Sequence, residues 1–312
     1  MTRTGFVYHD DFLRHDTGPG HPERPDRLRN LLAHLNQQQL LAELVAIPAQ
    51  NAEWSWVEAV HPRNYIESIQ SACKADLHFL DSDTPVSEHS YAAAFLAAGS
   101  AVAACDAVMN GGVRNAFSAI RPPGHHAERT RAMGFCLFNN VAIAARYLQI
   151  QHQLQKVCII DWDVHHGNGT QNIFYRDPSV FYVSIHQHPL YPGTGKKSER
   201  GEDHGEGATL NFPCPAGCGD KEYLEIFENE IAPEVSRYKP EFILISAGFD
   251  AHRDDPLANM KVTEAGFAAM TEVVTKLADQ TCQGRVVSLL EGGYNLEALA
   301  RSVEMHLRKL SN

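Results

Sequence analysis

The stretch Asp161–Gly169, which reads DWDVHHGNG, is the segment of this sequence richest in reactive side chains. Asp161, Asp163 and His165 occupy alternate positions in it. Alternate side chains of an extended chain point to the same side, so we expect these three to face a common point. Two neighbouring buried carboxylates are very costly unless a cation neutralises them, and carboxylate and imidazole both suit Zn²⁺. The stretch predicts a metal site rather than a solvated polar turn.

Asp250 ends the apolar run FILISAGFD and is the natural third ligand. Taken alone, it could equally be a turn residue or the N-cap of a helix. Together with Asp163 and His165, it completes a set of two carboxylates and one imidazole. Such a set leaves coordination positions open for water or substrate, as a catalytic zinc requires.

His125 and His126 follow the segment Arg121–Gly124, RPPG. The prolines exclude a helix, and the glycine permits a sharp turn. Two adjacent imidazoles can supply a general base and a general acid near neutral pH, although the sequence does not assign the two roles. Each ring needs a partner on its other nitrogen, and Asp161 and Asn168 are the candidates. A histidine pair without such partners would more simply be two loop residues with no role in catalysis.

Tyr294 lies in the segment EGGYN, just beyond the last apolar run. A phenol there could donate a hydrogen bond to a carbonyl oxygen as it becomes an oxyanion. The alternative is an ordinary aromatic residue at a glycine turn.

Short apolar runs alternate with helical stretches along the chain. Most runs lack period-two alternation, which is typical of strands buried on both faces of a parallel sheet. We predict strands at Gly5–Tyr8, Ala116–Ile120, Val157–Ile160, Val180–Ile185, Phe242–Ser246 and Arg285–Leu290. We predict helices at Arg24–Leu35, Tyr91–Met109, Phe138–Gln149, Lys221–Tyr238, Thr263–Ala278 and Leu296–Leu310. This order predicts an α/β fold with a single parallel sheet flanked by helices, in one domain spanning residues 1–312.

Five of the predicted strands lead directly into polar segments, which include all of the residues named above. In open α/β sheets, ligands bind beyond the carboxyl ends of the strands. The convergence of these segments at strand ends therefore predicts one shared active site.

The charge balance narrows the class of partner. The 312 residues include 27 Lys and Arg against 38 Asp and Glu, a formal charge of −11. Such a charge repels a phosphate backbone, so we expect no nucleic-acid partner and some attraction for cationic ligands.

We expect neither membrane insertion nor export. Tyr91–Met109 is apolar, but Asp106 interrupts it, so we expect a buried helix and no membrane partner. The first residues lack a signal-peptide core. The seven scattered cysteines indicate reduced thiols and a cytoplasmic protein.

Four motifs, RPPGHH, GFCLFNN, DWDVHHGNG and EGGYNL, resemble the zinc-dependent histone deacetylases and the bacterial deacetylase-like amidohydrolases. The resemblance runs over nearly the whole chain, from YHDDF and HPERPDRL to EGGYNL. It implies the arginase/deacetylase fold, with about eight parallel strands and the active site at their C-terminal ends. It also implies a zinc-dependent deacetylase, a hydrolase of linear amide C–N bonds that removes acetyl or other acyl groups from lysine side chains in peptides or proteins.

The resemblance also implies roles for individual residues. One zinc ion per chain would be held by Asp163, His165 and Asp250. His125 and His126 would be the tandem histidines, and Tyr294 would polarise the scissile carbonyl. Asp161 would orient His125, and Asn168 would orient His126. Class I members carry Asp at the Asn168 position, so the chain resembles class II, and we expect the charge of His126 to be less supported.

Further implied positions surround the zinc. The substrate tunnel would include Gly134, Phe135, Tyr191, Asp83, Leu257 and Gly293. Plain core packing is the alternative for the aromatic members of this set. A structural K⁺ ion would be held, partly through backbone carbonyls, by Asp161, Asp163, His165, Ser184 and Ile185.

Three other functions are compatible with part of this pattern. An acetylpolyamine amidohydrolase would use the same chemistry, but its relatives place an acidic gatekeeper where Leu257 stands, although Asp254 or Asp255 could supply charge. An arginase-like hydrolase with two Mn²⁺ ions would need a second cluster of ligands. A non-catalytic acetyl-lysine reader would tolerate loss of the ligands, yet all are present. The sequence leaves open the oligomeric state, the choice between Zn²⁺ and Fe²⁺, and the natural substrate.

Overall fold

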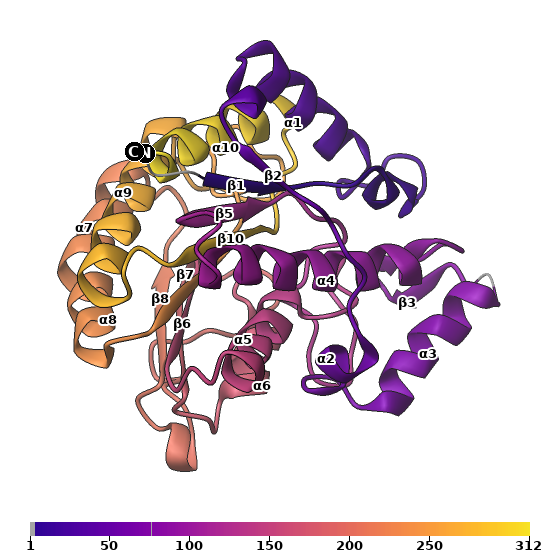
Figure 1. Cartoon of the computed structure of the whole chain (residues 1–312), viewed down its shortest axis with the longest axis horizontal. Helices are drawn as coiled ribbons and strands as arrows, with labels where there is room; N and C mark the ends of the chain where they lie inside the picture. Colours follow the sequence, from indigo (N-terminus) through magenta and orange to yellow (C-terminus); the bar gives the residue numbers. More distant parts are fainter. Residues whose placement is uncertain (1–3, 76) are drawn as a thin grey trace.

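The computed structural model describes residues 4–75 and 77–312 and is built around one eight-stranded sheet (Figure 1). The strand order is β2-β1-β5-β10-β9-β6-β7-β8, and all neighbours are parallel. The strands of this sheet are β1 (Thr4–Val7), β2 (Val45–Ile47), β5 (Asn115–Ser118), β6 (Val157–Asp161), β7 (Val180–Gln187), β8 (Thr209–Cys214), β9 (Phe242–Ala247) and β10 (Val286–Leu290). A separate antiparallel pair is formed by β3 (Phe79–Asp81) and β4 (Thr84–Pro85).

Helices cover both faces of the sheet, as the alternation of elements predicts. The α-helices are α1 (Asp26–Gln37), α2 (Trp54–Glu58), α3 (Arg63–Lys74), α4 (Ser90–Met109), α5 (Asn140–Gln151), α6 (Asn168–Phe174), α7 (Asp220–Ile226), α8 (Ala232–Tyr238), α9 (Glu264–Thr281) and α10 (Leu296–Leu310). Helices α4 and α5 lie on one face, and α1, α9 and α10 lie on the other (Figure 1). The predicted α/β architecture with a parallel sheet is therefore confirmed.

Helix α4 is long and apolar enough to cross a membrane by length and composition alone. However, 78% of its most apolar window is buried inside the protein. It is a core helix, as expected, and its many alanines allow it to lie close to the sheet.

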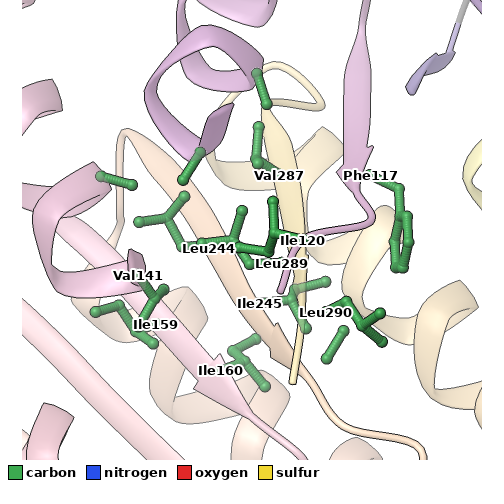
Figure 2. Close-up of a cluster of buried hydrophobic side chains, with 14 of the residues drawn as sticks. Phe117, Ile120, Val141, Ile159, Ile160, Leu244, Ile245, Val287, Leu289 and Leu290 are labelled. Carbon is green, nitrogen blue, oxygen red and sulfur yellow. The ribbon is translucent and has the colours of Figure 1, made fainter. Parts of the chain in front are cut away.

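The apolar strands form the core on both faces of the sheet. Every residue of β5, β6, β7, β9 and β10 is buried. Figure 2 shows side chains of four of these strands gathered in one cluster with Val141 of α5. This core holds the strands in register. Asp161 at the end of β6 pairs with Ser184 of β7 and Ser246 of β9. The polar segments that follow the strands are thereby brought together.

The structure departs from the sequence-based expectations at several elements. All six predicted strands exist, but the edge strands β2 and β8 were missed. Strand β2 has only three residues, and β8 contains Pro213, which is tolerated because β8 is an edge strand. The predicted helix Lys221–Tyr238 is interrupted by a π-helical turn at Phe227–Ile231, just before Pro233. Proline lacks an N–H and clashes with the preceding turn, so the helix does not continue uniformly through it. Helices α2, α3 and α6 were also missed.

The buried His306 of α10 makes stability depend on pH. It lies between the hydroxyls of Thr271 and Ser288, at 2.7 and 2.9 Å, and burial lowers its pKa from 6.5 to about 3. Below the unfolded-state pKa, the unfolded imidazole takes up a proton that the folded one does not, so the free energy of unfolding falls as pH falls. The lowered pKa of this residue alone should reduce the free energy of unfolding by about 2 kcal/mol as the pH falls from 6.5 to 5. Urea unfolding of His306→Gln should show a shallower decline with falling pH. The matched control His204→Gln, at an exposed site, should keep the wild-type slope; identical slopes in all three proteins would contradict the assignment.

Candidate active site

Asp163, His165 and Asp250 form a compact buried cluster where β6 and β9 end. One ligand atom from each lies within 4.8 Å of the others. His165 Nδ1 is 3.2 Å from Asp163 Oδ1 and 3.1 Å from Asp250 Oδ2. The opposite carboxylate oxygens accept backbone hydrogen bonds, from Gly292 N to Asp163 Oδ2 and from Val164 N to Asp250 Oδ1, both at 2.8 Å. These backbone bonds fix the direction in which each carboxylate points.

The donor set fits a divalent cation. Burial and the nearby Asp163 carboxylate raise the pKa of Asp250 to about 7, because two adjacent carboxylates do not both keep their charge without a compensating cation. Glycine is needed around the pair: a Cβ at Gly248 would collide with Asp163, and one at Gly292 with both carboxylates. Carboxylate and imidazole are donors that zinc and similar ions accept.

The two imidazoles predicted from RPPGHH lie beside this cluster, with ring centroids 4.0 Å apart. His125 Nδ1 is 3.1 Å from Asp161 Oδ2, which also accepts a 3.0 Å hydrogen bond from the Tyr182 hydroxyl. His126 Nδ1 is 2.8 Å from Asn168 Oδ1. The structure therefore brings together both histidines and both predicted orienting residues.

The two histidines experience different electrostatic environments. Burial lowers the pKa of each imidazole, but at His125 the carboxylates of Asp163 and Asp161 outweigh this effect and raise the pKa to about 10. At His126, burial and the neighbouring imidazoles hold the pKa well below 6.5. The pair thus combines one imidazole that favours the charged form with one that favours the neutral form.

Glu291 supports the histidine turn and was not predicted from the sequence, where Gly293 and Tyr294 of the same motif were assigned roles. Its Oε2 accepts hydrogen bonds from Gly124 N at 2.7 Å and His125 N at 3.2 Å, and its Oε1 accepts one from Ser246 Oγ at 3.1 Å. Glu291 is fully buried, and burial raises its pKa to about 7. It holds the turn after β5 against the ends of β9 and β10.

Tyr294 is positioned by two groups that the sequence reasoning also missed. Its backbone N–H donates to Asp255 Oδ2 at 2.7 Å, and the Arg27 guanidinium lies 5.0 Å from its ring centroid. Arg27 Nε donates to the carbonyl of Gly293 at 2.7 Å. Burial raises the pKa of the Tyr294 phenol well above 10, so it remains protonated at neutral pH and can donate a hydrogen bond.

A mostly apolar cavity of about 200 Å³ leads to these groups. It is lined by Asp83, His126, Gly134, Phe135, His165, Leu190, Tyr191, Leu257 and Tyr294. Five of the six predicted tunnel residues are among them. Gly293 is not among them, and its carbonyl accepts a hydrogen bond from Arg27 Nε. Leu190 was not predicted, although it directly precedes Tyr191 in the sequence.

Two walls of the cavity have defined supports. Asp83 Oδ1 accepts a hydrogen bond from Gly134 N at 3.0 Å, which ties the β3–β4 pair to the glycine beside Phe135. The segment that carries Tyr191 is held through Thr194, whose hydroxyl is 2.8 Å from His166 Nδ1.

The residues predicted for potassium include Asp163 and His165 of the cluster, and the other three lie in β6 and β7. Asp161 and Ser184 are paired in register on β6 and β7, and Ile185 follows in β7. All three side chains are buried, and Ser184 Oγ is 2.9 Å from His186 Nδ1.

Comparison with known proteins assigns the class. The family model described as histone deacetylase domain matches residues 21–310. The chain is 41% identical over 296 residues to a protein named probable deacetylase from Archaeoglobus fulgidus, covering 94% of this chain and 82% of that protein. It is 38% identical over 311 residues to a histone deacetylase-like amidohydrolase from Pseudomonas aeruginosa, covering 94% of this chain and 82% of the relative. The chain belongs to the histone deacetylase family.

A solved structure, the crystal structure of the HDA15 HD domain, superimposes with a TM-score of 0.94 at 40% identity, covering 99% of this chain and 88% of that chain. The predicted arginase/deacetylase fold is thereby confirmed. The family and the fold agree on a hydrolase of the deacetylase and amidohydrolase type.

We expect a divalent cation to stabilise the folded protein, because only the folded chain brings the three ligands together. At a free cation concentration of about 1,000 times Kd, the stabilisation should reach about 4 kcal/mol. Thermal unfolding with added Zn²⁺ and with a chelator measures it. Asp250→Asn should remove most of the difference, whereas Asp254→Asn, at an exposed site four residues later, should retain it. Equal stabilisation of the Asp250→Asn variant would place the cation elsewhere.

Proposed function

We propose that this protein removes acetyl or other acyl groups from lysine side chains of peptides or proteins, with one zinc ion held by Asp163, His165 and Asp250. The observation that carries the proposal is the mostly apolar cavity whose lining includes His126, His165 and Tyr294 beside the ligand cluster. Its mostly apolar walls suit an alkyl chain, and the polar groups of His126, His165 and Tyr294 suit an amide. Among residues 4–75 and 77–312, one such ligand cluster is found, which favours a single-metal enzyme over a binuclear hydrolase.

The residues around the cavity have different roles in amide hydrolysis. A zinc ion in the cluster would polarise the substrate carbonyl and lower the pKa of a bound water. His126 lines the cavity and has its Nδ1 engaged with Asn168, so its Nε2 is the atom that would take the proton of the attacking water and pass it to the leaving amine as the C–N bond breaks. His125, paired with Asp161, stabilises negative charge through its cationic form. The Tyr294 hydroxyl donates a hydrogen bond to the carbonyl oxygen as charge develops on it.

Other parts of the proposal rest on the same framework. Potassium bound at Asp161, Asp163, His165, Ser184 and Ile185 would brace the end of β6 against β7. Asp83 at the mouth would hold the backbone of a peptide substrate. The seven cysteines are free thiols, which supports a cytoplasmic location.

Tyr294→Phe should retain the fold and the metal but lose the donor to the developing oxyanion. We expect kcat to fall roughly 10²–10³-fold with little change in the thermal midpoint or in zinc content. Steady-state kinetics on an acetyl-lysine peptide, with metal analysis of the same samples, checks this. Near-normal turnover would remove Tyr294 from the mechanism.

The second candidate function is acetylpolyamine hydrolysis, and Leu257 at the cavity separates the two. Zinc-loaded protein should show kcat/KM at least about tenfold higher for acetyl-lysine peptides than for N-acetylated polyamines, because an apolar Leu257 offers no charge to a second ammonium group. Leu257→Glu should shift the ratio towards polyamines, whereas the isosteric control Leu257→Gln should not. A polyamine preference in the wild type would keep the catalytic groups but overturn the substrate, and would point to the exposed Asp254 as the source of charge, because the buried Asp255 is engaged by backbone N–H groups.

A further inference from the structure

Glu128 lies two residues after His126, in a tight turn in which its backbone N–H donates to Arg131 O at 2.9 Å. Its side chain is half-buried and turns back towards the start of α6. There its Oε1 accepts a hydrogen bond from Asn168 Nδ2 at 2.8 Å. Asn168 is the residue whose Oδ1 faces His126 Nδ1. The three side chains of His126, Asn168 and Glu128 therefore form one chain of hydrogen bonds that ends on a carboxylate.

Two acceptors face the NH₂ group of the Asn168 amide, and the Glu128 carboxylate at 2.8 Å is a far stronger acceptor than Met133 Sδ at 3.3 Å, so the carboxylate dominates the choice of amide orientation. A carboxylate oxygen only accepts hydrogen bonds, so it must face the NH₂ group of the amide. The reversed amide would set its carbonyl oxygen against the Glu128 oxygen and lose this bond. With the NH₂ group held by Glu128, the amide oxygen is left to face His126. A carbonyl oxygen also only accepts, so Nδ1 of His126 must carry the hydrogen.

We propose that Glu128 is a positioning residue that selects the tautomer of His126, by fixing the Asn168 amide so that Nδ1 is protonated and Nε2 is free to accept a proton in the cavity. The inference rests on the proposed function, in which the unprotonated Nε2 of His126 is the proton acceptor. Asn168 alone cannot supply this selection, since an amide offers a donor and an acceptor and can satisfy either tautomer once it rotates. The neighbouring His125 needs no such relay, because Asp161 contacts its Nδ1 directly at 3.1 Å.

The kinetic test compares two backgrounds. In the natural Asn168 background, Glu128→Ala should lower kcat about 10-fold with KM changed little, because the amide is free to rotate and part of the His126 population takes the wrong tautomer. Glu128→Gln keeps a carbonyl acceptor and should recover part of the loss. In an Asn168→Asp background no amide remains to be oriented and Glu128 faces a like charge, so adding Glu128→Ala should leave kcat unchanged or raise it. An equal loss in both backgrounds would show a merely structural role and overturn the proposal.

A spectroscopic test does not depend on turnover. In zinc-loaded protein labelled with ¹⁵N-histidine, the His126 signals, assigned by their absence in His126→Gln, should show a protonated Nδ1 and an unprotonated Nε2. Glu128→Ala should give ¹⁵N chemical shifts averaged over both tautomers. The control Arg129→Gln changes an exposed residue of the same turn and should give the wild-type shifts. Unchanged His126 shifts in Glu128→Ala would refute the proposal even if the enzyme is active. Conversely, shifted signals in a protein without deacetylase activity would support the positioning role and refute only the proposed function.

Discussion

At the carboxyl edge of the sheet, Asp161, Asp163, Asp250 and Glu291 are almost completely removed from water. A carboxylate in such surroundings must be hydrogen-bonded, paired or bound to a cation, or it takes up a proton. The four meet this requirement in three ways: Asp161 through His125, Glu291 through two backbone N–H groups and a serine, and Asp163 and Asp250 as a pair that could share one cation. The arrangement of the active site follows from how this negative charge is distributed.

A second buried charge cluster joins the N-terminal part of the chain to that edge. Glu23 is fully buried, and although burial opposes its charge, Arg121 and Arg27 outweigh that effect and lower its pKa to about 2. Arg121 also donates to the carbonyls of Phe12 and His15, at 2.8 and 3.1 Å. Arg121 begins the turn that carries the tandem histidines, and Arg27 touches the turn that carries Tyr294. Removing one partner of such a buried ion-pair cluster should lower the free energy of unfolding far more than removing one partner of a surface ion pair.

The two adjacent histidines differ in protonation because their hydrogen-bond partners differ. His125 contacts a carboxylate directly, whereas His126 reaches one only through the amide of Asn168. The direct contact supports a cation, and the amide relay fixes a tautomer without placing full charge next to the ring. This difference matches the need for one group that stabilises charge and another that exchanges a proton.

The sequence by itself determined the parallel α/β architecture and the grouping of the reactive segments, because apolar strand runs and the polar residues after them are local signals. It did not predict the short edge strand β2, the π-helical break near Pro233, or Gly293 as a partner of Arg27 rather than a tunnel residue. Glu291, Arg27 and Glu128 were also missed. Their partners are Gly124, Gly293 and Asn168, which lie far from them in the sequence. Which side chain meets which at the carboxyl edge depends on strand order and register, and these are set only when the whole sheet packs.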